Sequence, residues 1–413
     1  MHHNSAREPS PLSEMAAMRL MRERAEHDGT YLNFIGAGAY EHHIPAVVSQ
    51  LAARGDFCAN ISAQSAADVQ GTLQLLHQFQ SRMAMLLALD AVSCGAADGA
   101  CALADAITMA LRLHDQGRRV LMPRTLHPLW RGVVRTLTRH QRIEWVDLPY
   151  DPASGQSVCD GVDAAGCAVL IVPQPNFFGA LEAVDELTDW AHARGVLVIG
   201  VVNPLAMALL KPPGEWGGRG ADIAVGEVQP LGMPLSDRAG FVACRAEFAA
   251  ELPGCRVVHD GHNGHDGAAK YRAQSKHGTS PTPPVAGAAC MAIMGGHGLA
   301  AVAQASADCA AALASALAGI NGIERAFSAP IFHEFVLKLA TPAAAVLHAL
   351  KAQGILGGIP LIQHFPGLGE SLLVCATETK TATDIARYAD NMTRIIGKRF
   401  QPAPCSIKQA RNY

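Results

Sequence analysis

One stretch, residues 221–232 (ADIAVGEVQPLG), constrains the fold of this chain more than any other. It reads as a buried strand that runs into a Gly-containing loop. A second apolar run, residues 196–202, lies just before it and ends in Asn203 and Pro204. Two such runs predict neighbouring parallel strands whose carboxyl ends face one crevice, where open α/β sheets place their ligands. We therefore expect an α/β fold with a binding site at that edge.

The alternation of strands and helices extends along most of the chain. Further strands are expected at 119–122, 143–146, 168–172 and 240–244, and helices at 68–89, 101–112, 128–139 and 183–194. This order predicts a mostly parallel sheet that is covered by helices on both faces. Residues 93–100 (SCGAADGA) read as a small-residue loop that leads into a helix.

Three parts are expected along the sequence. Residues 1–30 form a helical arm of the kind that wraps a partner subunit. Residues 31–284 form a large α/β domain that ends in a linker rich in Gly, His and Pro, 253–284. Residues 285–413 begin with a long Ala-rich linking helix and continue as a small C-terminal α+β domain. Within that small domain we expect strands at 332–339 and 371–376 and helices at 342–353 and 381–396.

Composition argues against several classes of protein. The net charge of −3 gives no reason to expect a nucleic acid or an acidic membrane surface as a partner. No run looks long and apolar enough to cross a bilayer, and the N-terminus does not resemble a signal peptide, so we expect a cytoplasmic protein. The 11 cysteines include no Cys-x-x-Cys pair and read as reduced thiols. His259, His262 and His265 lie in a Gly-rich stretch typical of a solvated turn, so no metal site is expected.

Six short segments are spread along nearly the whole chain. They are 34–48 (FIGAGAYEHHIPAVV), 70–74 (QGTLQ), 124–128 (RTLHP), 174–179 (QPNFFG), 211–217 (KPPGEWG) and 354–361 (GILGGIPL). Together they resemble the first subunit of the two-chain bacterial glycine decarboxylase, the P-protein of the glycine cleavage system. The resemblance implies a fold type I-like architecture of pyridoxal phosphate (PLP)-dependent transferases. It also implies that a homologous second subunit carries the PLP, while the first subunit closes the active site.

The loop before residues 101–112 is one candidate binding segment. Backbone N–H groups and the dipole at such a helix start suit a phosphate. The family has a similar Tyr-Asp-Gly-Ala-Thr segment here, and Asp98, Gly99 and Ala100 match its central residues. Simple packing of small residues remains the favoured alternative for a short motif of this kind.

Arg124 and His127 form a second candidate, because loops at strand ends carry the working residues of α/β enzymes. An imidazole there can stack on a pyridine ring or shuttle a proton. Since a proline follows it, His127 can equally serve only to cap the next helix.

The positions that would hold PLP covalently carry other residues. A PLP enzyme needs a lysine for the Schiff base and usually a carboxylate against the ring nitrogen. The chain has no lysine before Lys211, which lies in a Pro-Pro-Gly turn typical of the surface. Gln229 stands where the resemblance places the lysine, and Asn203 where it places the carboxylate. We expect no covalent PLP on this chain and no catalytic residue in this chain alone, with Asn203 and Gln229 as polar contacts.

Two loops depart from the family pattern. Residues 59–68 (ANISAQSAAD) lack the aromatic and Pro-rich segment that the family has there. Thr279 and Ser280 align loosely with a family Ala-Thr-Ser-Asn segment, but residues 281–284 (PTPP) replace the rest. These departures put the ordinary substrate in question.

The expected function is that of the non-lysine subunit of a heteromeric PLP-dependent decarboxylase. By resemblance, the assembled enzyme decarboxylates glycine and transfers the aminomethyl group to a lipoyl carrier, the H-protein. One alternative is a paralogue that acts with its PLP-bearing partner on another amino acid or another carrier-bound intermediate. A second alternative, from a different class, is a non-catalytic scaffold subunit.

Overall fold

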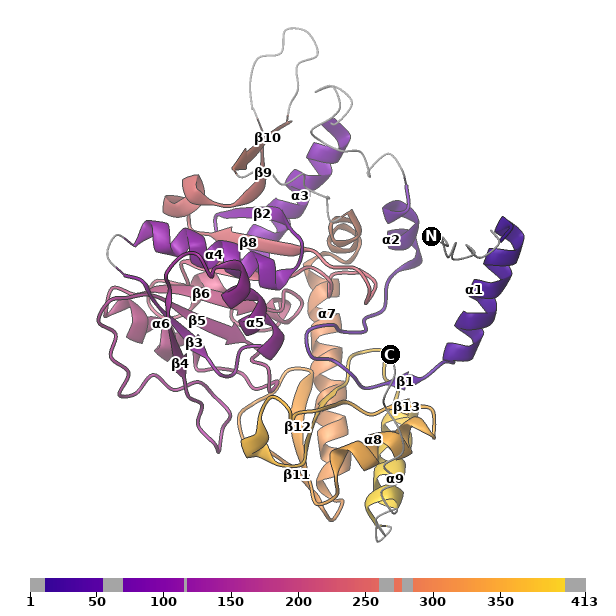
Figure 1. Cartoon of the computed structure of the whole chain (residues 1–413). Coiled ribbons are helices and arrows are strands. Elements are labelled where there is room, and N and C mark those ends of the chain that lie inside the picture. Colours follow the sequence, from indigo (N-terminus) through magenta and orange to yellow (C-terminus); the bar gives the residue numbers. More distant parts are fainter. Residues whose placement is uncertain (1–11, 55–69, 115–116, 260–270, 277–284, 398–413) are drawn as a thin grey trace, which may run out of the picture.

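The computed structural model describes residues 12–54, 70–114, 117–259, 271–276 and 285–397. Its centre is a nine-stranded sheet with the order β10-β9-β2-β8-β7-β6-β5-β3-β4 (Figure 1). The strands of this sheet are β2 (Ala91–Ala96), β3 (Arg119–Pro123), β4 (Glu144–Leu148), β5 (Cys167–Gln174), β6 (Leu197–Val202), β7 (Ile223–Glu227), β8 (Gly240–Cys244), β9 (Gly254–His259) and β10 (Tyr271–Lys276).

Five adjacent strands of this sheet, from β4 to β7, run parallel. The predicted pairing of the two apolar runs is confirmed, since Ile199 of β6 lies opposite Ile223 of β7. β8 is antiparallel to both β7 and β2, so β2 points in the same direction as the parallel strands. The carboxyl ends of β5, β6 and β7 therefore lie side by side at one edge.

Helices cover the sheet on both faces, as the alternation predicted. α4 (Gly99–Leu113) and α5 (Pro128–Leu137) pack on one face, and α3 (Gln70–Leu87), α6 (Val184–His192) and the start of α7 (Val285–Ala318) pack on the other. Two short 3-10 helices, η2 (Ala206–Ala208) and η3 (Pro213–Glu215), lie between β6 and β7, and η4 (Ala246–Glu251) follows β8.

A smaller sheet lies beyond α7. Its order is β11-β12-β15-β14, and it is covered by α8 (Ala343–Lys351) and α9 (Ala382–Gly397). The strands are β11 (Ile323–Arg325), β12 (Glu334–Leu339), β14 (Ile359–Pro360) and β15 (Ser371–Cys375), with η5 (Pro366–Leu368) before β15. The N-terminal β1 (Leu32–Asn33) pairs in parallel with β13 (Ile355–Leu356), which ties the start of the chain to this region. Figure 1 shows α7 running from the large sheet to the small one, as expected of a linking helix.

Two expectations about irregular segments were wrong. Residues 93–96, the first part of the loop expected at 93–100, belong to β2, where Ser93 and Cys94 are buried between β8 and β9. The small residues Ser93, Cys94 and Gly95 do not form the β-branched pattern that usually indicates a strand. The expected linker, 253–284, contains β9 and β10, an antiparallel pair that extends the sheet at its edge.

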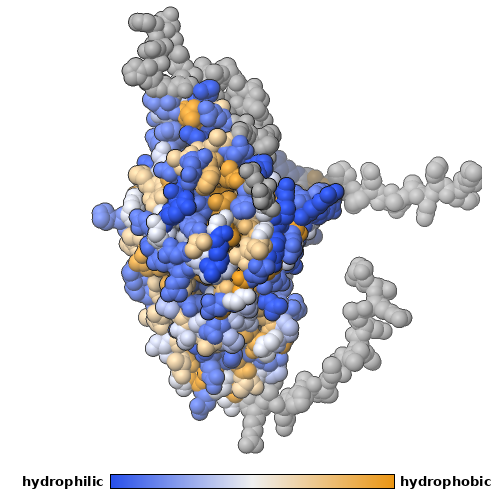
Figure 2. Space-filling view, turned by 90° about the vertical axis from the view of Figure 1, so that its left-hand side faces the viewer, coloured by the Kyte–Doolittle hydropathy of each residue, from blue (hydrophilic) through white to orange (hydrophobic). Residues whose placement is uncertain are grey.

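The expectation that no segment could cross a bilayer also needs correction. Within the described residues, α7 is long and apolar enough to do so, with a mean hydropathy of 1.6 over its most apolar window. Its composition explains this, because the helix is rich in Ala. The helix packs against α2 (Ala46–Ala52), α3 and α9 and kinks at Gly295, so it serves as a core helix of this fold. On the face drawn in Figure 2, hydrophobic residues lie scattered among hydrophilic ones, which is ordinary for a protein surface.

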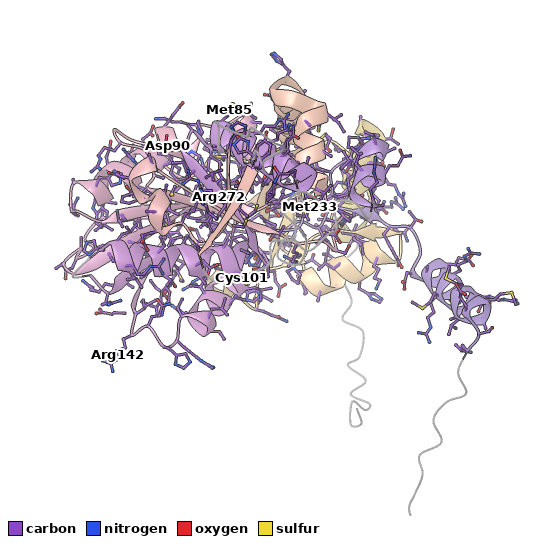
Figure 3. All side chains as sticks on the ribbon, turned by 90° about the horizontal axis from the view of Figure 1, so that it is seen from above. Met85, Asp90, Cys101, Arg142, Met233 and Arg272 are labelled. Carbon is purple, nitrogen blue, oxygen red and sulfur yellow. The ribbon has the colours of Figure 1, made fainter. Side chains whose placement is uncertain are left out.

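Within the expected N-terminal arm, residues 14–28 form a helix. α1 (Glu14–Asp28) begins with Ser13 as its N-cap and buries none of its residues. Figure 3 shows this helix standing apart from the body of the molecule. Met15, Met18 and Met21 are all exposed on it. Contact of this arm with a partner subunit stays a prediction.

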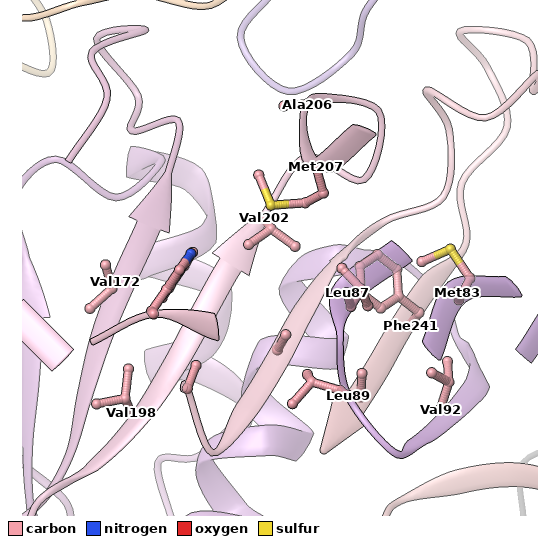
Figure 4. Close-up of a cluster of buried hydrophobic side chains, with 14 of the residues drawn as sticks. Met83, Leu87, Leu89, Val92, Val172, Val198, Val202, Ala206, Met207 and Phe241 are labelled. Carbon is pink, nitrogen blue, oxygen red and sulfur yellow. The ribbon is translucent and has the colours of Figure 1, made fainter. Parts of the chain in front are cut away.

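The core of the large domain follows the two-residue period of the strands. On β6, Val198 and Val202 point to the face of α3 and α6, while Ile199 and Val201 point to the face of α4. Figure 4 shows part of the first cluster, in which Val202 lies near Met207 while Leu87, Met83 and Phe241 gather beside it. Burial on both faces fixes the register of β6, since a one-residue slip would exchange the two faces.

Candidate functional site

A small cavity lies at the carboxyl ends of β5, β6 and β7, at the edge where a site was expected. Its volume is about 80 Å³. It is lined by Gly38, Tyr40, Leu126, His127, Trp130, Pro173, Pro175, Asn176, Phe177, Val201, Val202, Asn203, Pro204, Glu227 and Pro230. Rings and aliphatic side chains make up most of the wall, and a few polar groups converge on it, which is the usual composition of a ligand site.

His127 lies in this cavity and also caps a helix, so the capping alternative is confirmed, while a role toward a ligand stays a prediction. Its Nδ1 accepts a hydrogen bond from the Leu129 N–H at 3.1 Å, at the start of α5. Its Nε2 lies 2.9 Å from the Ala37 carbonyl oxygen and donates to it. Burial lowers the pKa of His127, so the ring is a neutral imidazole with both nitrogens occupied. Its free surface is the ring face, which packs beside Trp130 and Phe177.

Asn203 lies in the same cavity, directly after β6. Its Oδ1 accepts the Leu205 N–H at 3.0 Å, and its amide nitrogen lies 3.0 Å from Nε2 of His333. Burial lowers the pKa of His333 well below its usual value, so this ring is neutral and its Nε2 accepts from the Asn203 amide. An amide suits this position, because it donates to the ring and accepts from the backbone at once.

Gln229 is buried behind the cavity wall and fastens the loop that contains Tyr40. Its side-chain oxygen accepts the Tyr40 N–H at 3.0 Å. Its amide nitrogen donates to the carbonyl oxygens of Tyr40 at 2.9 Å and of Met233 at 3.2 Å. The side chain is 3% exposed and does not line the cavity. In this arrangement its polar atoms are engaged with backbone groups, so a role in ligand contact stays a prediction.

The Asp98–Ala100 loop forms the N-terminus of α4, where a phosphate was considered. Asp98 is the N-cap, and its carboxylate accepts the Cys101 N–H at 2.7 Å. The Gly99 N–H donates to Oε2 of Glu227 at 2.9 Å. A carboxylate of the chain itself therefore occupies the position at the N-terminus of α4 where a phosphate would bind. Ala100 is buried beneath it. A Cβ on Gly99 would collide with the Trp130 ring, which explains the glycine.

Of the remaining candidates, Arg124 lies in the part of the chain that the structure describes and does not line the cavity. Arg124 is exposed, and its backbone N–H donates to the Leu148 carbonyl. Thr279 and Ser280 lie outside the described residues, as do residues 59–68 and the histidines His262 and His265. Lys211 forms a surface ion pair with Asp185 at 2.8 Å. Among the described residues, no group of His, Cys, Asp and Glu has the arrangement of a metal site.

The residues present do not fit covalently bound PLP. The position at which the family resemblance places the Schiff-base lysine holds Gln229, whose amide is bonded to backbone atoms. The position at which the resemblance places the ring-nitrogen carboxylate holds Asn203, and an amide cannot keep that nitrogen protonated. The α4 N-terminus, a natural anion site, already holds Glu227. These two residues and the occupied N-terminus of α4 all act against the cofactor, so no step of chemistry is assigned to PLP on this chain.

Three residues of the site are not among the candidates chosen from the sequence. Glu227 ends β7, within residues 221–232, but its bond to Gly99 spans 128 positions and has no local signal in the sequence. Tyr40 and His333 pack ring to ring, with centroids 4.2 Å apart. The Tyr40 hydroxyl donates to Glu334 at 2.8 Å. A buried acidic residue within an apolar strand is the one local clue that could have led to Glu227.

Sequence comparisons show which family the chain belongs to. The family model of the glycine cleavage system P-protein matches residues 2–276. A probable glycine dehydrogenase (decarboxylating) subunit 1 from Nitrosospira multiformis is 47% identical over 94% of this chain and 90% of its own length. The protein of the same name from Nitrosomonas europaea is 48% identical over 92% of this chain and 88% of its own length.

Solved structures agree with the sequence comparisons. The crystal structure of an inhibitor-bound glycine decarboxylase (P-protein) of the glycine cleavage system superposes with a TM-score of 0.86 and 29% identity, over 94% of this chain and 91% of that one. A sphingosine-1-phosphate lyase from Burkholderia pseudomallei, at a TM-score of 0.70 and 16% identity over 94% of this chain and 92% of that one, shares the fold. The expected PLP fold type I architecture is thus confirmed, and the chain belongs to the glycine cleavage system P-protein family.

Proposed function

We propose that this chain is subunit 1 of a two-subunit glycine dehydrogenase (decarboxylating), in which the second, homologous subunit carries PLP. The similarity to relatives of that name, over nine-tenths of the chain, supports the subunit assignment. One observation above all supports the assignment of PLP to the second subunit. Gln229 stands where the family resemblance places the Schiff-base lysine, and its side chain is hydrogen-bonded to the backbone of Tyr40. The assembled enzyme would decarboxylate glycine in the cytoplasm and transfer the aminomethyl group to a lipoyl carrier protein.

In this assembly the chain would act through shape and binding, without proton transfer of its own. His127 is neutral and fully hydrogen-bonded, and Asn203 and Gln229 do not titrate. These side chains would hold the strand-end loops in place, and those loops would border the partner's site. The proposed boundaries are an arm at 1–30, a large domain at 31–284 and a linking helix with the small domain at 285–413.

Reconstitution tests the proposed function. The chain is mixed with the homologous second subunit from the same genome, PLP and a lipoyl carrier protein, and CO₂ release from carboxyl-labelled glycine is followed. We expect release only when both subunits are present. Release by the second subunit alone at the same rate would contradict a catalytic need for this chain and favour the scaffold alternative.

The substrate is tested in the same assay. Alanine and serine replace glycine at equal concentration, because the paralogue alternative requires another amino acid to be preferred. We expect glycine to give the highest kcat/KM. A higher kcat/KM for another amino acid would overturn the glycine assignment and support the paralogue.

A further inference from the structure

A groove lies at the amino ends of β3 and β4, at the opposite edge of the sheet from the cavity described above. Its volume of about 500 Å³ is in the range of small-molecule sites. Its lining includes Thr108, Arg112, Arg118, His140, Gln141 and Arg142, which come from the second half of α4, the residue before β3 and the turn between α5 and β4. Of the described residues that line this groove, three are arginines and none is acidic.

Positive charge is concentrated in the part of the sequence that builds this groove. Residues 112–142 contain eight arginines, no lysine and a single acidic residue, Asp115, which lies outside the described residues. The whole chain, in contrast, has a net charge of −3. A guanidinium group keeps its charge at physiological pH and presents a planar fork of N–H donors. Such forks bind anions that offer paired oxygens, and phosphates above all.

Two guanidinium groups of the groove are free to bind an anion. Within the described ranges, neither Arg118 nor Arg142 forms an ion pair or a side-chain hydrogen bond, and both residues are exposed. Arg112 pairs with Glu251 at 3.4 Å, so these two charges offset each other. The negative end of the α4 dipole lies beside the groove but amounts to only about half a charge. The two free arginines therefore leave the groove with a positive charge.

The turn that carries Arg142 is held in place against α4. Nε2 of Gln141 donates to Oγ1 of Thr108 at 2.8 Å, which links the turn before β4 to that helix. Arg142 follows directly and has a left-handed backbone conformation, with φ of 52°. This conformation is unfavourable for a residue with a Cβ and free of strain for glycine. Arginine is thus a poor choice for this backbone position, which supports a use for its side chain.

The charges on the neighbouring surface favour a small ligand over a long polyanion. Arg119, which starts β3, pairs with Glu144 at 3.0 Å. Asp147 of β4 pairs with both Arg131 and Arg135 of α5 at 2.8 Å. These carboxylates neutralise the arginines beside the groove and would repel the backbone of a nucleic acid that extended past it. A ligand that stays within the groove does not meet them.

We infer that this groove binds a diphosphate group, either as free pyrophosphate or as part of a nucleoside diphosphate. The guanidinium groups of Arg118 and Arg142 each bind one of the two phosphates. The ligand lies away from the proposed active site, because the five residues of β3 alone separate the two edges of the sheet by roughly 16 Å. Figure 3 shows Arg142 on a loop at the margin of the molecule, well apart from Cys101 in the first turn of α4.

Calorimetric titration of the full chain with pyrophosphate, and separately with ADP, tests this inference. We expect one pyrophosphate per chain and weaker binding of citrate, whose carboxylates do not reproduce two linked phosphates. An affinity for ADP no higher than that for pyrophosphate assigns the site to the diphosphate group itself, whereas a higher one assigns it to a nucleotide. Failure of both to bind would overturn the inference. Citrate or a DNA duplex that binds as tightly as pyrophosphate would also overturn it.

Arg142→Gly is the most informative variant. It removes one guanidinium and places glycine where the backbone is left-handed, so the chain should remain folded. Pyrophosphate should bind about tenfold more weakly or worse, because a charge-assisted hydrogen bond is lost. Arg118→Gln should give a loss of similar size.

The matched control is Arg24→Gln, which removes the same charge from an exposed position of α1 and should leave pyrophosphate affinity unchanged. Parental affinity in either Arg142→Gly or Arg118→Gln would contradict the site. These titrations involve neither the partner subunit nor turnover, so their failure leaves the proposed function untouched.

Discussion

Two buried carboxylates of this molecule, Glu227 and Glu334, lie in different surroundings. Glu227 borders the cavity and accepts two backbone N–H groups. Glu334, in the small sheet, is enclosed and accepts the Ala37 N–H at 2.5 Å and the Tyr40 hydroxyl at 2.8 Å. Glu227 has room for a ligand beside it, whereas Glu334 joins the 36–43 loop to β12. One buried carboxylate thus borders a cavity, and the other serves as a structural link between two segments.

The largest expected difference comes from truncating these two groups. Glu334→Ala leaves a buried N–H and a buried hydroxyl unpaired, and it should lower the free energy of unfolding by roughly 3 to 5 kcal/mol. Glu227→Ala frees two N–H groups beside a cavity that water can enter, so about 1 kcal/mol is expected. Urea unfolding of both variants measures the difference. Equal losses would show that the two carboxylates do not differ as described.

The pH dependence of the free energy of unfolding should reveal the contribution of Glu334. Burial raises the pKa of Glu334 to about 7, from 4.5 in its ordinary state. Between these values the folded chain binds more protons than the unfolded one, so this group makes stability fall as pH rises from about 4.5 to 7. The total is on the order of 3 kcal/mol.

The comparison with Glu334→Gln isolates that contribution. His333 has a lowered pKa and acts in the opposite direction, with stability lost as pH falls, but it is present in both proteins. Chemical denaturation at a series of pH values should therefore give a flatter decline above pH 4.5 for Glu334→Gln. Parallel curves for the two proteins would contradict the raised pKa.

An intermediate effect is expected at Gln229. Gln229→Ala removes the partners of both the N–H and the carbonyl of Tyr40, and it should lower the free energy of unfolding by about 1 to 3 kcal/mol. Gln50→Ala, at an exposed position of α2, serves as the matched control and should change little. If Gln229→Ala is as stable as the control, Gln229 does not fasten this loop, and its side chain becomes available for a ligand.

The smallest effect is expected at Lys211. Its ion pair with Asp185 is at the surface, with 43% and 53% of the two side chains exposed. Solvent screening makes such pairs weak, so Lys211→Ala should change the unfolding free energy by no more than about 0.5 kcal/mol. A thermal or urea melt decides this. A loss above 2 kcal/mol would mean that Lys211 has a structural role that its exposure hides.

The sequence predicted those parts of the fold that depend on local pattern. β5, β6 and β7 are buried on both faces, so their apolar runs were visible. His127 and Asn203 could be chosen because they directly follow strands of one parallel sheet. β2 escaped notice because its Ser, Cys and Gly residues lack the β-branched pattern of a strand.

The contacts that define the site could not be predicted from local sequence patterns. The bond from Gly99 to Glu227 and the bonds from Gln229 to Tyr40 join residues 128 and 189 positions apart. Asn203 and His333 are 130 positions apart. Only the tertiary fold brings such pairs together. The bond of Glu227 to the N-terminus of α4 and the bonds of Gln229 to Tyr40 could therefore be found only from the structure.

The central claim is that this chain contributes to a PLP enzyme without holding the cofactor. The most direct test is borohydride reduction of the assembled two-subunit enzyme with PLP, followed by peptide mapping of the attached cofactor. The account predicts reduced cofactor on one lysine of the partner subunit and none on this chain. A reduced adduct at a single lysine of this chain, formed in proportion to activity, would contradict it.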